Sequence, residues 1–178
     1  MPTYAAFLRA INLGAKRKFP KDAIKAAVEA AGGTDVETYI NTGNVRLTTS
    51  LRSRAKVEAA LEKAFHADRG FEVPTMVFTL AELADVAAYA EQLRAEHGEP
   101  KAHYVALFKD APTAAAVRAL AEAEFPGERA FVEGRAAHGL LYLPFNESKL
   151  FTSSVFAGLG TATSRNLTVV RALAEKWG

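Results

Sequence analysis

The stretch VETYINTGNVRLTT, residues 36–49, decides the fold of this chain. Its two arms are rich in β-branched and aromatic residues, which favour strands. The arms flank the polar tetrapeptide Asn41-Thr42-Gly43-Asn44, whose Asn and Gly residues tolerate the positive φ angles of tight turns. The pattern therefore predicts a β-hairpin with strands at Val36–Ile40 and Val45–Thr49.

Elements on both sides of the hairpin extend this pattern. The sequence predicts a strand at Thr3–Arg9, a helix from Pro20 to Ala31, a helix from about Ser53 to Ala67 and a strand at Val73–Phe78. Pro20 suits the first helical position, where its missing N–H is no loss. The apolar helix faces consist of Ile24, Ala27, Val28 and Ala31, and of Val57, Ala60, Leu61, Ala64 and Phe65. The order βαββαβ is that of a ferredoxin-like unit.

The rest of the chain repeats this order in part. Thr79 and Glu82 form a capping box that opens a connecting helix, which ends before Gly98-Glu99-Pro100. The sequence then predicts a strand at His103–Lys109, a helix at Thr113–Glu124, strands at Ala130–Glu133 and Leu140–Leu143, a loop from Pro144 to about Ser164, and a last helix. This second order is βαββα, without a final strand.

We therefore expect an α/β (α+β) protein with two ferredoxin-like βαββα-type units in tandem and a connecting helix. The first unit, residues 1–78, carries a basic loop between its first strand and first helix. Residues 79–100 form the connecting helix and linker, and residues 101–178 form the second unit with its C-terminal helix.

Composition excludes several classes of protein. The chain has 178 residues, of which 49% are hydrophobic and 24% charged, as in ordinary globular proteins. It has no cysteine, which rules out disulfides, thiolate zinc sites, iron–sulfur clusters and a cysteine nucleophile. No apolar run reaches the ~18 residues of a membrane span. The N-terminus lacks the charged-then-apolar pattern of a signal peptide, because polar and charged residues interrupt it from Arg9 onward. We expect a cytoplasmic protein that does not contact membranes.

Positive charge gathers near the N-terminus. The net charge is only +2, but residues 1–25 hold six cationic residues and the single acidic residue Asp22. This end of the chain therefore favours anions, although solvated surface charge is an equally good interpretation of the short Lys16–Lys18 run.

Motifs for specific chemistry are absent. The four histidines, His66, His97, His103 and His138, have no metal-ligand spacing, so no metal site is expected. The chain lacks a nucleophile elbow, a dinucleotide fingerprint and a Walker A motif. Ser53 and Lys56 match S-x-x-K, but a serine at a helix start is an ordinary cap. No general base stands out beyond the nearby carboxylates Asp22 and Glu147, so enzymatic activity and cofactors stay open.

Three polar segments are candidates for a ligand site. The first runs from Arg9 to Lys18 and precedes a helix, so its backbone can form an anion nest. The second is Asn41–Asn44, for which a plain hairpin turn is the alternative. The third, Thr163–Asn166, is expected to open the last helix. The macrodipole there disfavours Arg165 unless an anion binds beside it or its side chain pairs with Glu147.

We expect the first and third segments to meet in one anion-accepting pocket. The predicted ligand-binding residues are Arg9, Asn12, Gly14, Lys18, Asn41, Asn44, Arg165 and Asn166.

These segments together resemble the bacterial family known as domain of unknown function 1697 (DUF1697). The resemblance rests on Arg9-Ala10-Ile11-Asn12-Leu13-Gly14 with Lys18 and Pro20, on Tyr39-Ile40-Asn41-Thr42-Gly43-Asn44-Val45, and on Arg165-Asn166. The chain departs from the family pattern at Ala15, where a second glycine is usual, and at Leu167, where a tryptophan is usual. The family resemblance implies paired ferredoxin-like units and supplies no activity, substrate or catalytic residue.

Three functions remain from the sequence. The first is a site, binding or enzymatic, for a small anionic ligand such as a phosphorylated metabolite or nucleotide. The second is nucleic-acid binding through the basic loop, which the near-neutral net charge disfavours. The strand Val45–Thr49 also carries no aromatic residue on which a base could stack. The third is a structural protein whose sheets complete each other in an oligomer.

Overall fold

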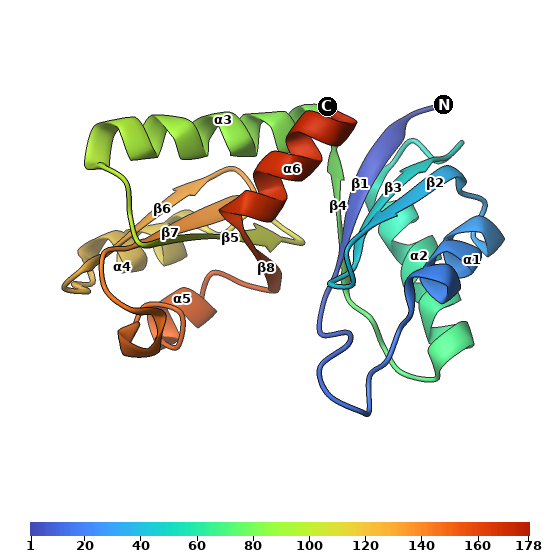
Figure 1. Cartoon of the computed structure of the whole chain (residues 1–178), viewed down its shortest axis with the longest axis horizontal. Coiled ribbons are helices and arrows are strands. Elements are labelled where there is room, and N and C mark those ends of the chain that lie inside the picture. The colour runs from blue at the N-terminus through green and yellow to red at the C-terminus, as the bar shows by residue number, and fades with distance from the viewer. The chain divides into compact units, whose positions relative to one another are not determined.

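The computed structural model describes residues 1–178 and divides into two compact units (Figure 1). The first unit is Met1–Leu83 with Trp177–Gly178, and the second is Ala84–Lys176. Each contains one four-stranded antiparallel sheet with helices, which confirms the predicted fold class. No helix combines the length and the apolar character needed to cross a membrane.

The first unit has the predicted βαββαβ order. Its elements are β1 (Thr3–Leu8), α1 (Lys21–Ala30), β2 (Thr34–Tyr39), β3 (Asn44–Thr48), α2 (Arg54–Arg69) and β4 (Thr75–Thr79). The strands lie in the order β2-β3-β1-β4, so β1 and β3 are central, as in a ferredoxin-like sheet. Pro20 takes the N-cap position just before α1, one residue earlier than predicted.

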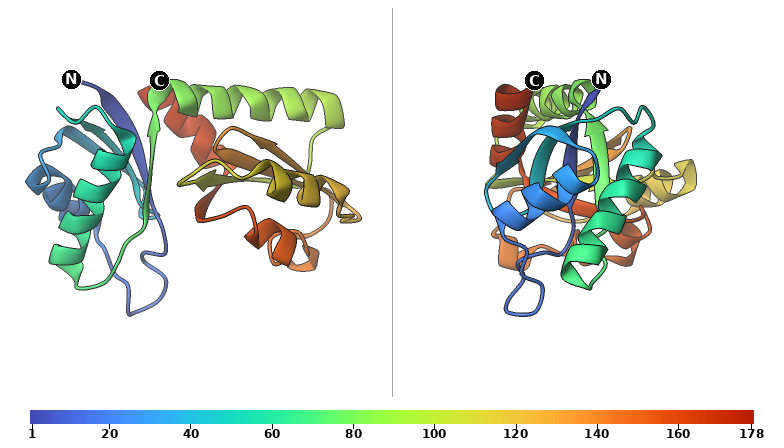
Figure 2. Two further views of the ribbon diagram at one scale, coloured as in Figure 1. Left: turned by 180° about the vertical axis from the view of Figure 1, so that it is seen from behind. Right: turned by 90° about the vertical axis from the view of Figure 1, so that its right-hand side faces the viewer.

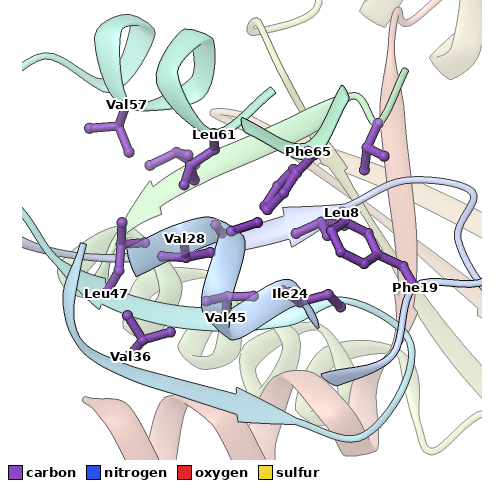
Figure 3. Packing of buried hydrophobic residues seen from close by; sticks show 14 of the residues in the cluster. Leu8, Phe19, Ile24, Val28, Val36, Val45, Leu47, Val57, Leu61 and Phe65 are labelled. Atoms are coloured by element: carbon purple, nitrogen blue, oxygen red, sulfur yellow. The ribbon is translucent and has the colours of Figure 1, made fainter. Parts of the chain in front are cut away.

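Both helices of the first unit cover the same face of its sheet (Figure 2). Figure 3 shows how Val57, Leu61 and Phe65 of α2 point toward α1 and the sheet. All three are at most 1% exposed, which confirms the predicted helix face. Phe19, from the loop before α1, packs edge-on against Phe65 with ring centroids 5.2 Å apart. This contact attaches the end of the basic loop to the core.

The hairpin differs from its prediction in one backbone detail. Tyr39 pairs with Asn44, and residues 40–43 form the connection. Positive φ falls on Ile40 (49°) and Gly43 (86°) rather than on Asn41. A Cβ atom at Gly43 would lie 2.7 Å from the Cβ of Leu8, so only glycine fits there.

The second unit completes the βαββαβ order, and here the prediction was wrong. Its elements are α3 (Leu80–His97), which begins in the first unit, β5 (Ala102–Phe108), α4 (Ala114–Glu122), β6 (Glu128–Glu133), β7 (Ala136–Leu141), the 3-10 helix η1 (Phe145–Glu147), α5 (Ser154–Ala157), β8 (Ala162–Asn166) and α6 (Leu167–Trp177). The sheet order is β6-β7-β5-β8. Strand β8, which we expected to be loop, pairs with β5 and supplies the missing final strand.

Helices cover both faces of the second sheet. Figure 1 shows α3 and α6 on one face and α4 and α5 on the other. The ring of Tyr89 from α3 lies against that of His138 from β7, at 5.3 Å between centroids. The predicted capping box at the start of α3 is confirmed, because Thr79 Oγ1 accepts from the Glu82 N–H (3.0 Å) and Glu82 Oε2 accepts from the Thr79 N–H (2.7 Å).

Candidate functional site

Three segments of the first unit meet at the end of β1. We call them the loop cluster: the loop Arg9–Lys18, the turn Ile40–Gly43 and the segment Gly70–Pro74. The Leu8 N–H donates to the Gly43 carbonyl (2.9 Å), and the Arg9 N–H donates to the Pro74 carbonyl (2.9 Å). The strand end is therefore attached on both sides. Figure 2 shows the loop extending past the end of the sheet.

Asn12 fixes the shape of the loop. Its Nδ2 donates to the carbonyls of Phe19 (3.1 Å) and Asn41 (2.6 Å), and its Oδ1 accepts from the Phe19 N–H (2.8 Å). Its own N–H donates to the Arg17 carbonyl (2.7 Å). Asn12 thus holds the loop against the turn, and its side-chain amide already has partners on both atoms. The structure gives it a positioning role in the loop cluster.

Two arginines that sequence reasoning did not single out support the same loop. Arg17 donates to the carbonyls of Ala10 (2.5 Å) and Glu72 (2.6 Å), and its guanidinium lies 4.4 Å above the ring of Phe71. Arg69 donates to the Lys18 carbonyl (3.3 Å) and lies 5.2 Å from the ring centroid of Phe19. The two cation–π contacts, of Arg17 with Phe71 and of Arg69 with Phe19, add to this attachment. The sequence carried little signal for these contacts, because Glu72 lies far along the chain from Arg17 and Lys18 lies far from Arg69.

Asn44 is part of the hairpin rather than of an exposed surface. It is 1% exposed and donates to the Tyr39 carbonyl (3.0 Å) and to Thr42 Oγ1 (2.9 Å). Asn41 is exposed, and its carbonyl is the acceptor for Asn12. The turn residues therefore support the loop through the backbone.

The backbone of the loop alternates in the sign of φ. Ala10, Asn12 and Gly14 have φ of 58°, 54° and 74°, while Ile11 and Leu13 between them are not in the positive region. In an anion-binding nest, residues of opposite φ sign alternate so that successive N–H groups point to one side. A Cβ atom at Gly14 would meet nothing within 4 Å, so its φ alone favours glycine there.

The same loop carries exposed cations. The side chains of Arg9, Lys16 and Lys18 all face solvent, and none forms a salt bridge within the chain. The loop leads into α1, whose N-cap Pro20 provides no side-chain acceptor for the first N–H groups. The loop therefore combines unneutralised positive charge with backbone donors.

Arg165 does not open a helix, so our reason for placing an anion there was wrong. It lies in β8 opposite Val105, is 6% exposed, and donates to Thr163 Oγ1 (2.7 Å) and the Ser164 carbonyl (2.9 Å). Burial lowers the pKa of its guanidinium to about 10. Both of these partners belong to its own strand, and the helix begins only at Leu167.

Asn166 occupies the position that we had assigned to Arg165. Its Oδ1 accepts from the Thr168 N–H (2.8 Å), so it caps α6. Arg9 and Arg165 belong to different units, and their meeting in one pocket stays a prediction.

A buried histidine pair in the second unit escaped sequence reasoning. His103 Nε2 and His138 Nδ1 lie 3.0 Å apart, and the residues are 3% and 0% exposed. Burial, with Arg94 and Arg171 nearby, lowers the pKa of His103 to about 4, and burial with His103 lowers that of His138 to about 3. Both rings are therefore neutral at pH 7. Their outer nitrogens, His103 Nδ1 and His138 Nε2, have no partner.

Two further interpretations concern the first unit. Ser53 accepts from the Lys56 N–H (3.5 Å) as the N-cap of α2, which confirms its structural assignment. On the helix-free face of the sheet, Phe7 and Phe78 meet at 5.9 Å between centroids, and both are at most 1% exposed. The two rings pack edge-on against each other.

Comparisons with known proteins agree with this description. The family model described as "Protein of unknown function (DUF1697)" matches residues 1–138, and the chain belongs to this family. The match includes the loop cluster and ends before Arg165 and Asn166.

A solved structure shows the same fold over almost the entire chain. It is a conserved bacterial protein, SP0830 from Streptococcus pneumoniae, with a TM-score of 0.78 and 20% identity, covering 99% of this chain and 98% of the other. Among curated proteins, none matches this chain.

Proposed function

We propose that the first unit binds a small phosphate-bearing ligand at the loop Arg9–Lys18. The observation that carries the proposal is the alternating φ of Ala10, Asn12 and Gly14. A non-glycine residue in the left-handed region costs energy, and two such residues with a glycine in one short loop suggest a selected backbone shape. The Asn12 N–H already donates to the Arg17 carbonyl, so the neighbouring N–H groups of the loop would bind the phosphate oxygens.

Charge supports the same ligand. Arg9, Lys16 and Lys18 supply exposed cations on the loop, and charge-assisted hydrogen bonds to phosphate are stronger than neutral ones. Asn12 and Arg17 supply rigidity, because they bind the loop to its surroundings without using the exposed cations. A preorganised site binds with less loss of conformational entropy. The proposal is for binding and assigns no reaction.

Thermal unfolding in different salts tests the proposal. Phosphate or sulfate should raise the midpoint of unfolding more than chloride at equal ionic strength, because a ligand that binds only the folded state stabilises it. The double variant Arg9→Ala/Lys18→Ala should lose this difference. The matched variant Arg52→Ala/Lys56→Ala, with two exposed cations of the same unit outside the loop, should keep it.

A second variant separates the backbone from the charges. Gly14→Val retains every cation but disfavours the φ of 74°, so it should also lose the phosphate effect while the core stays folded. Equal stabilisation by phosphate and chloride in the wild type would overturn the proposal. Stabilisation by an oligonucleotide with a steep dependence on salt, but not by phosphate, would favour nucleic acid instead.

A further inference from the structure

Strand β6 leaves one edge of the second sheet unpaired. The sheet order places β6 outermost, with β7 on its inner side only. A groove of about 870 Å³ borders the first part of this strand, and its lining includes Phe125, Ala130, Phe131 and Tyr142. Exposed strand edges are templates for pairing with another strand unless a protein blocks them. The sheet order gives β6 no neighbouring strand on its outer side.

The backbone of β6 presents donors and acceptors to this groove. Glu133 pairs with Ala136 across the two-residue turn Gly134-Arg135, and the Tyr142 N–H donates to the Gly127 carbonyl (2.8 Å). In an antiparallel ladder, hydrogen-bonded pairs alternate with non-hydrogen-bonded ones. The odd-numbered residues 127–133 therefore bond inward to β7. Ala130 and Val132 turn their N–H and C=O groups outward.

We propose that β6 pairs antiparallel with β6 of a second copy of this chain, centred on Phe131. This register sets Ala130 against Val132 of the second copy as a hydrogen-bonded pair, which uses the outward groups. It also sets Arg129 against Glu133 of the second copy, twice by symmetry. Opposite charges facing each other across strands stabilise the pairing. The strand Glu-Arg-Ala-Phe-Val-Glu is thus complementary to itself.

Other registers fit less well. Centring on Ala130 would set Arg129 against Phe131, and centring on Val132 would set Phe131 against Glu133. A register displaced by one residue would set residues whose N–H and C=O groups point outward opposite residues whose groups already bond to β7. The middle of β6, from Ala130 to Val132, is half-buried and apolar, while its charges lie toward the ends. The arrangement favours a symmetric partner over an unrelated peptide.

Site-specific cross-linking tests the register. The chain has no cysteine, so one introduced thiol gives an unambiguous result. At the centre of the proposed pairing, two copies of residue 131 form a non-hydrogen-bonded pair with Cα atoms about 4.5 Å apart, within disulfide reach. Phe131→Cys should form a disulfide-linked dimer on mild oxidation. Val132→Cys, whose partner is Ala130, should stay monomeric. Equal cross-linking of both variants, or none in Phe131→Cys, would overturn the proposal.

A charge swap tests the same contact without oxidation. In sedimentation velocity, the wild type should dimerise with rising concentration. Arg129→Glu should weaken dimerisation by at least about tenfold, because it creates like-charge pairs on both sides of the symmetry axis. Arg129→Glu/Glu133→Arg should restore it, while Arg52→Glu, the same change in the first unit, should have no effect. A monomeric wild type at every concentration, or no recovery in the double variant, would contradict the inference.

A proline variant checks the role of the edge itself. Ala130→Pro removes an N–H that points outward, so it should abolish dimerisation while the thermal midpoint shows that the monomer still folds. Phosphate stabilisation of the first unit is independent of these variants, so the two proposals succeed or fail separately.

Discussion

At the scale of single residues, Ile40 is the clearest case of backbone strain. It is β-branched, has φ of 49° and remains 39% exposed. The left-handed region is unfavourable for such a residue, and burial does not compensate. Ile40→Asn should therefore stabilise the protein by roughly 1 kcal/mol, measured as the free energy of unfolding in urea.

The control for this prediction is another exposed apolar residue in the same cluster. Leu13 is 67% exposed and does not have positive φ, so Leu13→Asn should give no comparable gain. If both substitutions stabilise equally, relief of surface hydrophobicity and not of strain would be the cause.

At the scale of elements, α2 owes its position to the side chains that it buries. Leu61 is 1% exposed within the core of the first unit. Leu61→Ala should lower the free energy of unfolding by roughly 2–5 kcal/mol through lost burial and a cavity. Lys63→Ala, an exposed change on the same helix, should cost less than about 0.5 kcal/mol. A loss below about 1 kcal/mol for Leu61→Ala would show that this face packs loosely.

Helix α6 depends on its cap. Asn166→Ala removes the acceptor for the Thr168 N–H and should cost about 1 kcal/mol, whereas Asn166→Asp should retain the cap. Denaturant unfolding of both variants measures the effect. The cap explains Asn166 without a ligand, so phosphate stabilisation should survive in Asn166→Ala. Its loss there would show that Asn166 does belong to the anion site.

At the scale of the whole molecule, two units of similar topology should respond differently to acid. Only the second unit contains fully buried histidines, His103 and His138. Their folded pKa values of about 4 and about 3 lie below the unfolded value near 6.5, so the unfolded state binds more protons between these values. Stability should therefore fall as pH falls below about 6.5, by on the order of 2 kcal/mol for each histidine at pH 5.

Hydrogen exchange at several pH values locates this loss. Amides of β5 and β7 should lose protection toward pH 5 before those of β1 and β3. The groups around the pair are Tyr89, Glu91 and Arg94 on α3 and Arg171 on α6, and the two arginines disfavour protonation further. The variant His103→Val/His138→Phe should flatten the pH profile, whereas replacing the exposed His66 with Gln should leave it unchanged. Uniform loss of protection in both sheets would contradict the prediction.

Local sequence pattern determined much of this protein. The β-branched and aromatic residues on both sides of the turn Asn41–Asn44 defined the hairpin, and the spacing of Val57, Leu61 and Phe65 defined the buried face of α2. The capping box at Thr79 also followed from the sequence, because its donor and acceptor lie three residues apart. The N-cap at Ser53 also followed from the sequence, because its hydroxyl and the Lys56 N–H lie three residues apart. These features need only neighbours along the chain, so their residue types predict them.

Contacts between distant segments decided the rest. Strand β8 is polar and short, and it becomes a strand because β5 offers it a pairing edge. That pairing places Arg165 in a sheet and leaves Asn166 to cap α6. His103 and His138 meet only because β5 and β7 are neighbours, and Asn12 reaches the Asn41 carbonyl only because the hairpin folds beside β1. The physical reason is that burial and hydrogen-bond partners depend on which surfaces meet in space, and residue type alone does not specify this.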